Sequence, residues 1–498
     1  MKGKFRSQIT VVGGGPGGLA AAIRLAAAGC QVTVLERNAR VGGKMNALEW
    51  HGFHWDTGPT LLTMPQVLAD LWSAVGAKLD DDIDLMPMPE TCRYRWQDGT
   101  VINADAAFWA RPEVAAFLRH AKGYHDPGAI TRLDPPPAGR QNPRTAGNLP
   151  GLRQLWMRLD PRSLARVNAG IFPRSPHLQQ VFNSFATCRG SSPYAAPAAL
   201  QAIPYSLARF GGWYPRGGMV AIAAAMENLA LRQGVTIETG EEVARLQENS
   251  GRWTVFHRPT AGGAVRPRQC DGIVCNMDAL AATRAFLDPS FEPRQPLSMS
   301  GFMIHAAVAR TYPDLGHHNT LFSSDYPREF RGIFTTGDPV GEPTVSIAIS
   351  AKSDATRAPA GCENWSVLVN APALKPGIEW PVIAARYADA ILGGLTRHGV
   401  DDPRPHIRWM RIVTPEDFSV NHLAMGGSFH GYASHSLFPA GKRPAIASGR
   451  PGLVFAGGST RPGGGIPAVV LSGQLAASTL LTQLGRAPHP PATATPAA

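Results

Sequence analysis

Cysteine is scarce in this chain, and the few cysteines present lack metal-binding spacing. They stand at positions 30, 92, 188, 270, 275 and 362, and no Cys-x-x-Cys pair occurs. Structural zinc sites and disulfide frameworks usually show closely spaced cysteines. The pattern therefore predicts reduced, mostly buried thiols in a cytosolic protein, and no metal site.

Long hydrophobic runs are also missing. No uninterrupted apolar stretch reaches 18 residues, whereas a helix that crosses a bilayer needs about that many. Gly13, Gly14 and Gly15 interrupt the N-terminal apolar run at once, which excludes a secretory signal. We expect a cytoplasmic protein that is either in solution or peripheral to the inner face of the membrane.

Charged residues are few, at 17% of the chain, but basic ones predominate and give a net charge of +11. Forty of the 48 basic residues are arginine, and no block of five or more basic residues occurs. The absence of such a block argues against a nucleic-acid partner. The charge fits a lipid surface or a phosphorylated ligand, although biased base composition would also enrich arginine.

What the chain does contain is enough apolar material for several cores. It has 498 residues, of which 44% are hydrophobic, with 53 glycines and 44 prolines. At about 150 residues per unit this length predicts roughly three units. Disordered and fibrous chains are excluded by the hydrophobic content.

Both ends of the chain carry a strand, a glycine-rich turn and a helix. Near the N-terminus we expect strands at Ile9–Val12 and Gln31–Glu36 around a helix at Leu19–Ala28, which is a parallel βαβ unit. Near the C-terminus we expect a strand at Leu453–Ala456 and a helix from Pro467 to about Leu484. Proline favours the first turn of a helix.

The first turn reads Gly13-Gly14-Gly15-Pro16-Gly17-Gly18 and matches the dinucleotide-binding pattern G-x-G-x-x-G. In that pattern Gly13 allows a tight turn, Gly15 admits a pyrophosphate, and Gly18 lets the helix approach the strand. Glu36 ends the second strand, where a carboxylate accepts the ribose hydroxyls. A packing turn and a solvated surface glutamate are the alternatives, but together the residues predict dinucleotide binding.

Further motifs identify the kind of dinucleotide protein. Val41-Gly42-Gly43-Lys44 follows Glu36, and Asp56-Thr57-Gly58-Pro59-Thr60 follows in turn. These residues resemble the flavoprotein group of amine oxidases, Rab escort factors and carotenoid desaturases. The stretch Phe455 to Pro467 resembles the closing signature of the bacterial-type carotenoid (phytoene) desaturase family. The resemblance covers nearly the whole chain from Ile9 to Leu484.

The resemblance implies FAD as the cofactor. The Gly-Gly-Lys turn would lie along the ribityl and phosphate chain, and the Asp-x-Gly-Pro turn would reach the isoalloxazine ring. The helix that begins near Pro467 would direct its positive end at the flavin and favour the reduced form. The cofactor-binding residues expected on this basis are Gly13, Gly15, Pro16, Gly17, Gly18, Glu36, Arg37, Gly42, Gly43, Lys44, Asp56, Thr57, Gly58, Pro59, Thr60, Val243, Gly458, Gly465, Ile466 and Pro467. For Asp56, capping of a neighbouring helix is the alternative.

The implied fold is α/β, with a Rossmann-like FAD domain, an antiparallel-sheet substrate domain and a helical lid. The expected divisions are an FAD domain (1–75, 211–284 and 445–486), a substrate domain (76–104 and 285–444), a lid or membrane-associating region (105–210) and a disordered tail (487–498). An apolar stripe of Leu152, Leu155, Trp156 and Leu159, with arginines around it, is typical of an interfacial helix. A helix packed on its neighbours is the alternative.

The implied activity is introduction of C=C bonds into an acyclic carotenoid, with hydride transfer to flavin N5 and proton loss at the membrane surface. A quinone or oxygen would accept the electrons. An isomerase, a saturase, a terminal oxidase and a non-redox binding protein are the alternatives. The sequence does not specify an oligomeric state.

Catalytic residues are hard to identify. Where relatives commonly have histidine and glycine in the closing signature, this chain has Arg461 and Ala468, which favours relatives acting on modified carotenoids, such as 1-hydroxycarotenoid 3,4-desaturases. Arg461, Asp325 and Glu329 are the weak catalytic candidates, and solvated charges are the expected role of the two carboxylates. His317 and His318 would point to opposite faces of a strand and bind no common metal.

Overall fold

The computed structural model describes residues 6–124, 160–435 and 443–487. Its N-terminal elements are strand β1 (Gln8–Val12), helix α1 (Pro16–Ala27) and strand β2 (Gln31–Glu36). The predicted βαβ unit is confirmed, except that α1 begins at Pro16, three residues before the expected start. Proline has no N–H to lose at that position, which is why the helix can include it.

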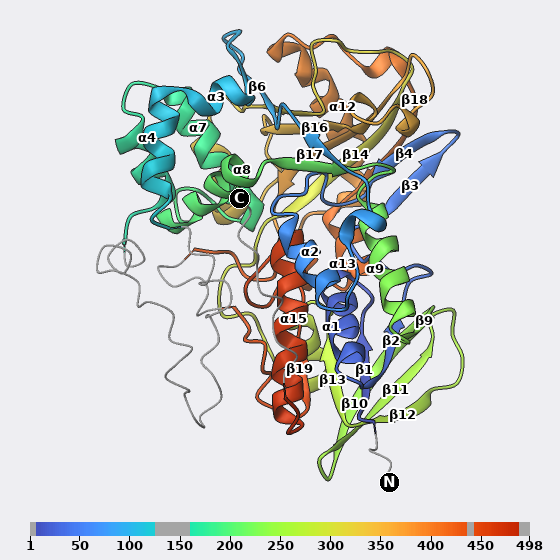
Figure 1. Ribbon diagram of the computed structural model, residues 1–498. Coiled ribbons are helices and arrows are strands. Elements are labelled where there is room, and N and C mark those ends of the chain that lie inside the picture. The colour runs from blue at the N-terminus through green and yellow to red at the C-terminus, as the bar shows by residue number, and fades with distance from the viewer. Residues whose placement is uncertain (1–5, 125–159, 436–442, 488–498) are drawn as a thin grey trace.

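A five-stranded parallel sheet organises this half of the molecule, in the order β19-β13-β1-β2-β9 (Figure 1). The added strands are β9 (Thr236–Thr239), β13 (Gly272–Cys275) and β19 (Leu453–Phe455). Helix α15 (Ile466–Gln483) follows β19, so the predicted C-terminal unit is also confirmed. Both glycine turns therefore open at the carboxyl edge of one sheet, with β13 and β1 as neighbouring central strands.

The two faces of this sheet have different cores because side chains alternate along a strand. Val11, Val274 and Val454 face the helices α1, α15 and α9 (Val220–Arg232). Val12 and Phe455 face the opposite way, against the antiparallel sheet of β10 (Glu241–Asn249), β11 (Arg252–Pro259) and β12 (Arg266–Cys270). The sheet is thus buried on both sides, as a parallel sheet requires.

The second large sheet has seven strands, in the order β18-β14-β17-β16-β15-β6-β7. Its strands are β6 (Arg93–Arg95), β7 (Val101–Asn103), β14 (Ser300–Val308), β15 (His318–Leu321), β16 (Val345–Ile349), β17 (Glu363–Ala371) and β18 (Ile407–Val413). All neighbours are antiparallel except β15 and β6. The expected antiparallel sheet is confirmed, with the β6–β7 hairpin added to its edge in parallel.

Helices cover this sheet and its edge. Helix α12 (Trp380–Gly394) packs on one face through Trp380 and Ile391. Figure 1 shows a group of short helices beside the β6–β7 edge. They are α3 (Ala106–Ala110), α4 (Pro112–Ala121), α6 (Leu164–Ile171), α7 (Pro176–Ser184) and α8 (Ala202–Phe210). Their core is aromatic, since Phe182 stacks within 4.0 to 5.0 Å of Phe117 and Phe172.

Shorter elements connect these parts. They are β3 (Ala47–Trp50), β4 (Phe53–Asp56), α2 (Gln66–Ser73), β5 (Leu85–Met88), β8 (Gly212–Pro215), α10 (Ala279–Ala282), α11 (Tyr326–Arg331) and α13 (Pro415–His422). Among the described residues, no helix is both long and apolar enough to span a bilayer. The stripe from Leu152 to Leu159 lies outside the described residues, as does the tail from 488.

Candidate functional site

The first glycine turn is built for a close approach between backbone segments. Gly13 has φ +96°, and a Cβ at Gly18 would lie 2.1 Å from the carbonyl oxygen of Gly13. Gly15 is the N-cap residue of helix α1, which has no side-chain cap from the described residues and no acidic residue in its first turn. Backbone N–H groups at that end therefore remain available to an anionic ligand.

Glu36 lies against this turn at the end of β2. Its side chain is 4% exposed, and its carboxylate accepts hydrogen bonds from the Gly14 N–H at 2.7 Å and the Asn38 N–H at 2.8 Å. The carboxylate is thus fixed beside the glycine loop. Arg37 points elsewhere, since its Nη1 donates to the carbonyl of Val420 at 2.7 Å.

The turn of Gly42, Gly43 and Lys44 packs directly on the first turn. The Gly42 N–H donates to the carbonyl of Gly14 at 2.9 Å, and a Cβ at Gly43 would lie 3.4 Å from the Cα of Gly15. Lys44 Nζ donates to the carbonyl of Phe429 at 2.9 Å. Burial lowers the pKa of Lys44, and nearby Asp278 opposes this shift.

The turn from Asp56 to Thr60 packs on the Lys44 turn, because a Cβ at Gly58 would lie 2.0 Å from the carbonyl oxygen of Lys44. The Asp56 carboxylate accepts hydrogen bonds from Tyr214 Oη at 2.6 Å and from the Met219 N–H at 2.8 Å. Met219 is the N-cap residue of α9, so this carboxylate does cap a neighbouring helix, which was the alternative.

The last turn residue, Thr60, faces the seven-stranded sheet. His318 Nε2 lies 3.0 Å from Thr60 Oγ1, and burial lowers the pKa of His318 to about 4. One face of β15 continues from there. Thr320 Oγ1 lies 3.4 Å from the sulfur of Cys92, and Phe322 stacks on Trp96 at 5.0 Å.

The carboxy-terminal glycine turn is held by residues remote in sequence. A Cβ at Gly464 would lie 2.1 Å from Nδ1 of His430. Arg189 Nη1 donates to the carbonyl of Gly464 at 2.9 Å, and Arg443 Nη1 donates to the carbonyl of His430 at 2.7 Å. Gly465, with φ +92°, is the N-cap of α15, and no described side chain caps that helix.

Asn276 joins the two glycine turns, and sequence reasoning missed its role. It follows β13, the strand between β1 and β19, and its Nδ2 donates to the carbonyl of Gly13 at 3.2 Å. A Cβ at Gly17 or Gly457 would lie 2.6 or 3.0 Å from its Oδ1. Its place directly after the buried apolar strand β13 is the signal that could have identified it.

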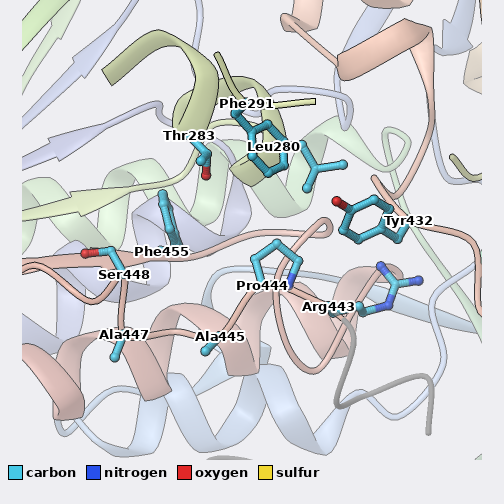
Figure 2. Close-up of a pocket in the computed structure, with 10 residues that line it drawn as sticks. All are labelled: Leu280, Thr283, Phe291, Tyr432, Arg443, Pro444, Ala445, Ala447, Ser448 and Phe455. Carbon is cyan, nitrogen blue, oxygen red and sulfur yellow. The ribbon is translucent and has the colours of Figure 1, made fainter. Parts of the chain in front are cut away.

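A pocket of about 290 Å³ adjoins the carboxy-terminal turn (Figure 2). Its lining is mainly apolar, and Arg443 and Tyr432 lie on one side of it, opposite Ser448 and Phe455. Since Arg443 also donates to the carbonyl of His430, the same guanidinium contacts both the pocket wall and the segment packed on the turn.

The remaining predicted residues are dispersed. Val243 is a partly buried residue of β10 behind the five-stranded sheet. The Arg461 N–H donates to the carbonyl of Pro444 at 3.2 Å. Asp325 caps α11 by accepting from the Arg328 N–H at 2.9 Å, and its side chain is 53% exposed.

Glu329 is a correction to the sequence prediction, because it is completely buried instead of solvated. Its carboxyl accepts hydrogen bonds from Thr344 Oγ1 at 2.7 Å and Asn370 Nδ2 at 3.0 Å. Burial raises its pKa, opposed by those hydrogen bonds. The partners lie next to β16 and on β17, so the i, i+4 spacing on a short helix could not reveal them.

The histidine pair is a second correction. The rings of His317 and His318 lie 4.3 Å apart and do not point to opposite faces. Strand β15 begins only at His318, so strand alternation does not apply to His317. Within residues 6–124, 160–435 and 443–487, no three His, Cys, Asp or Glu residues form a group that could hold a metal ion.

Comparison with known proteins gives one family and several long relatives. The model of the flavin containing amine oxidoreductases matches residues 16–313. A 4,4'-diapolycopene oxygenase of Methylomonas sp is 34% identical over 97% of this chain and 100% of the relative. A zeta-carotene-forming phytoene desaturase of Myxococcus xanthus is 32% identical over 95% of this chain and 94% of its own length. A 1-hydroxycarotenoid 3,4-desaturase of Flavobacterium sp. (strain P99-3) is 30% identical over 94% of this chain and 98% of its own length.

Solved structures share the fold at lower identity. An oxidoreductase from Methanosarcina mazei superposes with a TM-score of 0.61 at 18% identity, covering 94% of this chain and 98% of the other. A putrescine oxidase bound to putrescine superposes with a TM-score of 0.61 at 14% identity, covering 96% of this chain and 99% of the other. These structures share the overall fold of the chain.

Proposed function

The chain belongs to the flavin containing amine oxidoreductase family and is an FAD-dependent oxidoreductase, and we propose that it oxidises an acyclic carotenoid. The observation that carries the proposal is the uncharged face of β15. His318 and Thr320 of β15, with Phe322 directly after the strand, lead from the Thr60 turn to the aromatic cluster around Trp96. A long hydrocarbon needs such a face, because unpaired charges along it would have to be desolvated.

The side chains of this face are neutral at physiological pH for physical reasons. Burial lowers the pKa of His318 to about 4, and burial raises the pKa of the Cys92 thiol to about 12. Tyr94 stacks on Phe322 at 5.8 Å and is itself buried. We place the substrate chain along this face, with the bond to be oxidised next to the Thr60 turn.

The chain's glycine turns fit FAD, since they bring backbone segments together closely and leave N–H groups at the starts of α1 and α15 without a cap from the described side chains. The two helix starts, which no described side chain caps, and Glu36 suit its pyrophosphate and a ribose. The turn at Gly42–Lys44 packs on the first turn, and the turn at Thr57–Thr60 packs on Lys44. The set proposed from the sequence is retained, with Asp56 and Arg37 as residues whose side chains are tied to other segments. When bound, FAD would be the acceptor of a hydride from an allylic carbon of the substrate.

We propose that the oxidation is a desaturation, which introduces a C=C bond. Terminal oxidation is the second candidate, because a relative named an oxygenase is 34% identical over nearly the full length of both chains. Quinone or oxygen is the proposed electron acceptor. The proposed location is the inner face of a membrane, where the net charge of +11 would favour anionic lipid. The division of the chain into an FAD domain, a substrate domain and a lid is also a proposal.

The test uses the purified protein with FAD and liposomes loaded with phytoene, followed by visible absorbance with a quinone added or under air. Bands that move to longer wavelength would support desaturation, because the conjugated system is being extended. Liposomes loaded with a coloured acyclic carotene or its hydroxylated form test terminal oxidation by chromatography of the products. Gly18→Ala serves as the FAD-free control, and a lack of any product from all three substrates would refute carotenoid oxidation.

A further inference from the structure

We propose that Arg189, Arg443 and Lys44 form a cationic cluster that stabilises the negative charge of the reduced flavin and so raises its reduction potential. The inference rests on the FAD site described above, but it does not depend on the identity of the substrate. It concerns residues from three distant segments, two of which lie outside the glycine motifs.

Arg189 and Arg443 lie against the carboxy-terminal turn, and Lys44 is bound to the segment that packs on it. Arg189 Nη1 donates to the carbonyl of Gly464 at 2.9 Å, and a Cβ at Gly463 would lie 2.4 Å from the same nitrogen. Arg443 Nη1 donates to the carbonyl of His430, and Lys44 Nζ donates to that of the preceding Phe429. The His430 ring packs on Gly464, and all three cations act on it electrostatically.

The charges in this cluster do not balance. Among the described residues, the carboxyl group that acts on Lys44 and Arg443 is Asp278, which caps α10 by accepting from the N–H groups of Leu280 and Ala281. His430 adds no charge, because burial and the three cations hold its pKa well below the ordinary value. The described residues therefore bring three basic side chains and one carboxyl group to this part of the molecule, and burial raises the pKa of that carboxyl group.

Such an arrangement is costly in the absence of an anion. Burial lowers the pKa of Arg189, and burial together with Arg189 lowers that of Arg443 to about 9. Both shifts mean that the surroundings disfavour the charged forms. An anion that enters the same low-dielectric space recovers part of that cost.

Reduction of the bound flavin would introduce a negative charge during the reaction itself. A hydride, carrying two electrons, passes from a substrate carbon to the flavin, and a proton leaves the neighbouring carbon for solvent. The substrate gains a C=C bond, and the flavin gains one negative charge, which it keeps unless it takes up a further proton. Cations already in place stabilise that charge without reorganising. The proposed quinone or oxygen then removes the electrons.

If Arg189 served only to hold the turn in place, its positive charge would not matter. The hydrogen bonds to the Gly464 and His430 carbonyls require donors but no charge, and a glutamine amide can donate as well as a guanidinium can. Arg189→Gln keeps a donor and loses the charge, whereas Arg189→Lys keeps the charge. The pair therefore separates electrostatic stabilisation from attachment of the turn.

The experiment measures the flavin midpoint potential of the FAD-loaded protein by dye-coupled reductive titration, and the dissociation constant of the sulfite adduct as a second probe of negative charge on the flavin. In Arg189→Gln we expect the oxidised-to-reduced equilibrium to shift about tenfold toward oxidised flavin, about 30 mV for a two-electron couple, with sulfite binding about tenfold weaker. Arg189→Lys should remain near the wild type. Arg174→Gln, at an exposed position, is the matched control.

Equal potentials in wild type and Arg189→Gln, or a lysine variant as impaired as the glutamine variant, would overturn the inference. If Arg189→Gln fails to fold, the wild type still provides a test through the spectrum of its reduced flavin. That flavin should stay anionic at least one pH unit below the pH at which free reduced FAD takes up a proton, and protonation at or above that pH would overturn the inference. All of these readouts are obtained without carotenoid, so failure of the proposed substrate leaves them unaffected.

Discussion

The two glycine turns of the five-stranded sheet share a construction but differ in the charge around them. Each turn follows a parallel strand, β1 or β19, and leads into a helix without a side-chain cap from the described residues. The helices α1 and α15 pack so closely that a Cβ at Gly473 would lie 2.1 Å from the carbonyl oxygen of Gly17. The two turns therefore have the same backbone construction.

What differs is the side chains that other segments bring to each turn. The first turn has the Glu36 carboxylate accepting from the Gly14 N–H. The second has the guanidiniums of Arg189 and Arg443 donating to backbone carbonyls in or beside the turn. A carboxylate suits neutral hydroxyl donors such as those of a ribose, whereas guanidiniums suit a developing negative charge. Distant residues thus give one local motif two chemical roles.

The largest expected effect comes from filling the first turn. Gly18→Ala places a Cβ 2.1 Å from the Gly13 carbonyl oxygen, and since this oxygen belongs to the backbone, no side chain can move to relieve the clash. We expect a loss of stability of about 3 kcal/mol or more and no FAD retained on purification. Gly170→Ala, in a helix with open space around it, should be neutral or slightly stabilising in the same thermal unfolding assay.

Glu36→Gln should weaken FAD binding while leaving the potential of the bound flavin unchanged. The amide loses charge-assisted hydrogen bonds worth about 2 kcal/mol, which corresponds to roughly 30-fold in the FAD dissociation constant. Fluorescence titration of FAD measures the affinity, with Glu49→Gln on exposed β3 as the control. A changed potential in Glu36→Gln would contradict the division of roles between the two turns.

Gly464→Ala should cost less than Gly18→Ala, because its Cβ would meet a side chain. The nearest atom is Nδ1 of His430, at 2.1 Å. We expect a loss of about 1 to 3 kcal/mol, and the double variant with His430→Ala should recover part of it. A double-mutant cycle by denaturant unfolding of the FAD-loaded protein measures the coupling. Strict additivity would show that His430 is not the source of the clash.

The local parts of both turns were predictable because the responsible residues are neighbours in sequence. Strands, glycine spacing and Glu36 lie within one βαβ unit, and the strands proved correct to within one residue. The carboxylate of Asp56 was open to two interpretations, and its contact with the Met219 N–H shows that it caps a helix while leaving its cofactor role a prediction. The cofactor roles of individual residues stay predictions.

The surroundings of the turns were not predictable from one sequence. Arg189 lies 275 positions from Gly464, the residue to which it donates, and nothing local distinguishes it from 39 other arginines. Glu329 was misjudged for the same reason, because its partners Thr344 and Asn370 belong to other elements. Asn276 differs from these residues, because the sequence held a signal for it that was missed. The parallel strand before it leads to the same sheet edge as both turns.

The smallest expected effect is a dependence of stability on pH that arises from His430, beside the second turn only. Burial, Arg443, Lys44 and Arg189 hold the pKa of His430 well below its usual value, so below about pH 6.5 the unfolded chain binds a proton that the folded chain does not. Stability is therefore lost as the pH falls, by at most about 1.4 kcal/mol per pH unit from this one group.

In His430→Asn this contribution disappears. Denaturant unfolding between pH 7 and pH 5 should give a shallower loss of stability than in wild type, while His51→Asn, at an exposed position, should keep the wild-type slope. Other buried histidines, among them His305 and His435 with a pKa lowered to about 4, titrate equally in both proteins and cancel in the difference. Identical slopes would mean that His430 binds its proton equally in the folded and unfolded chains, which would contradict the effect of burial and of the three cations on its pKa.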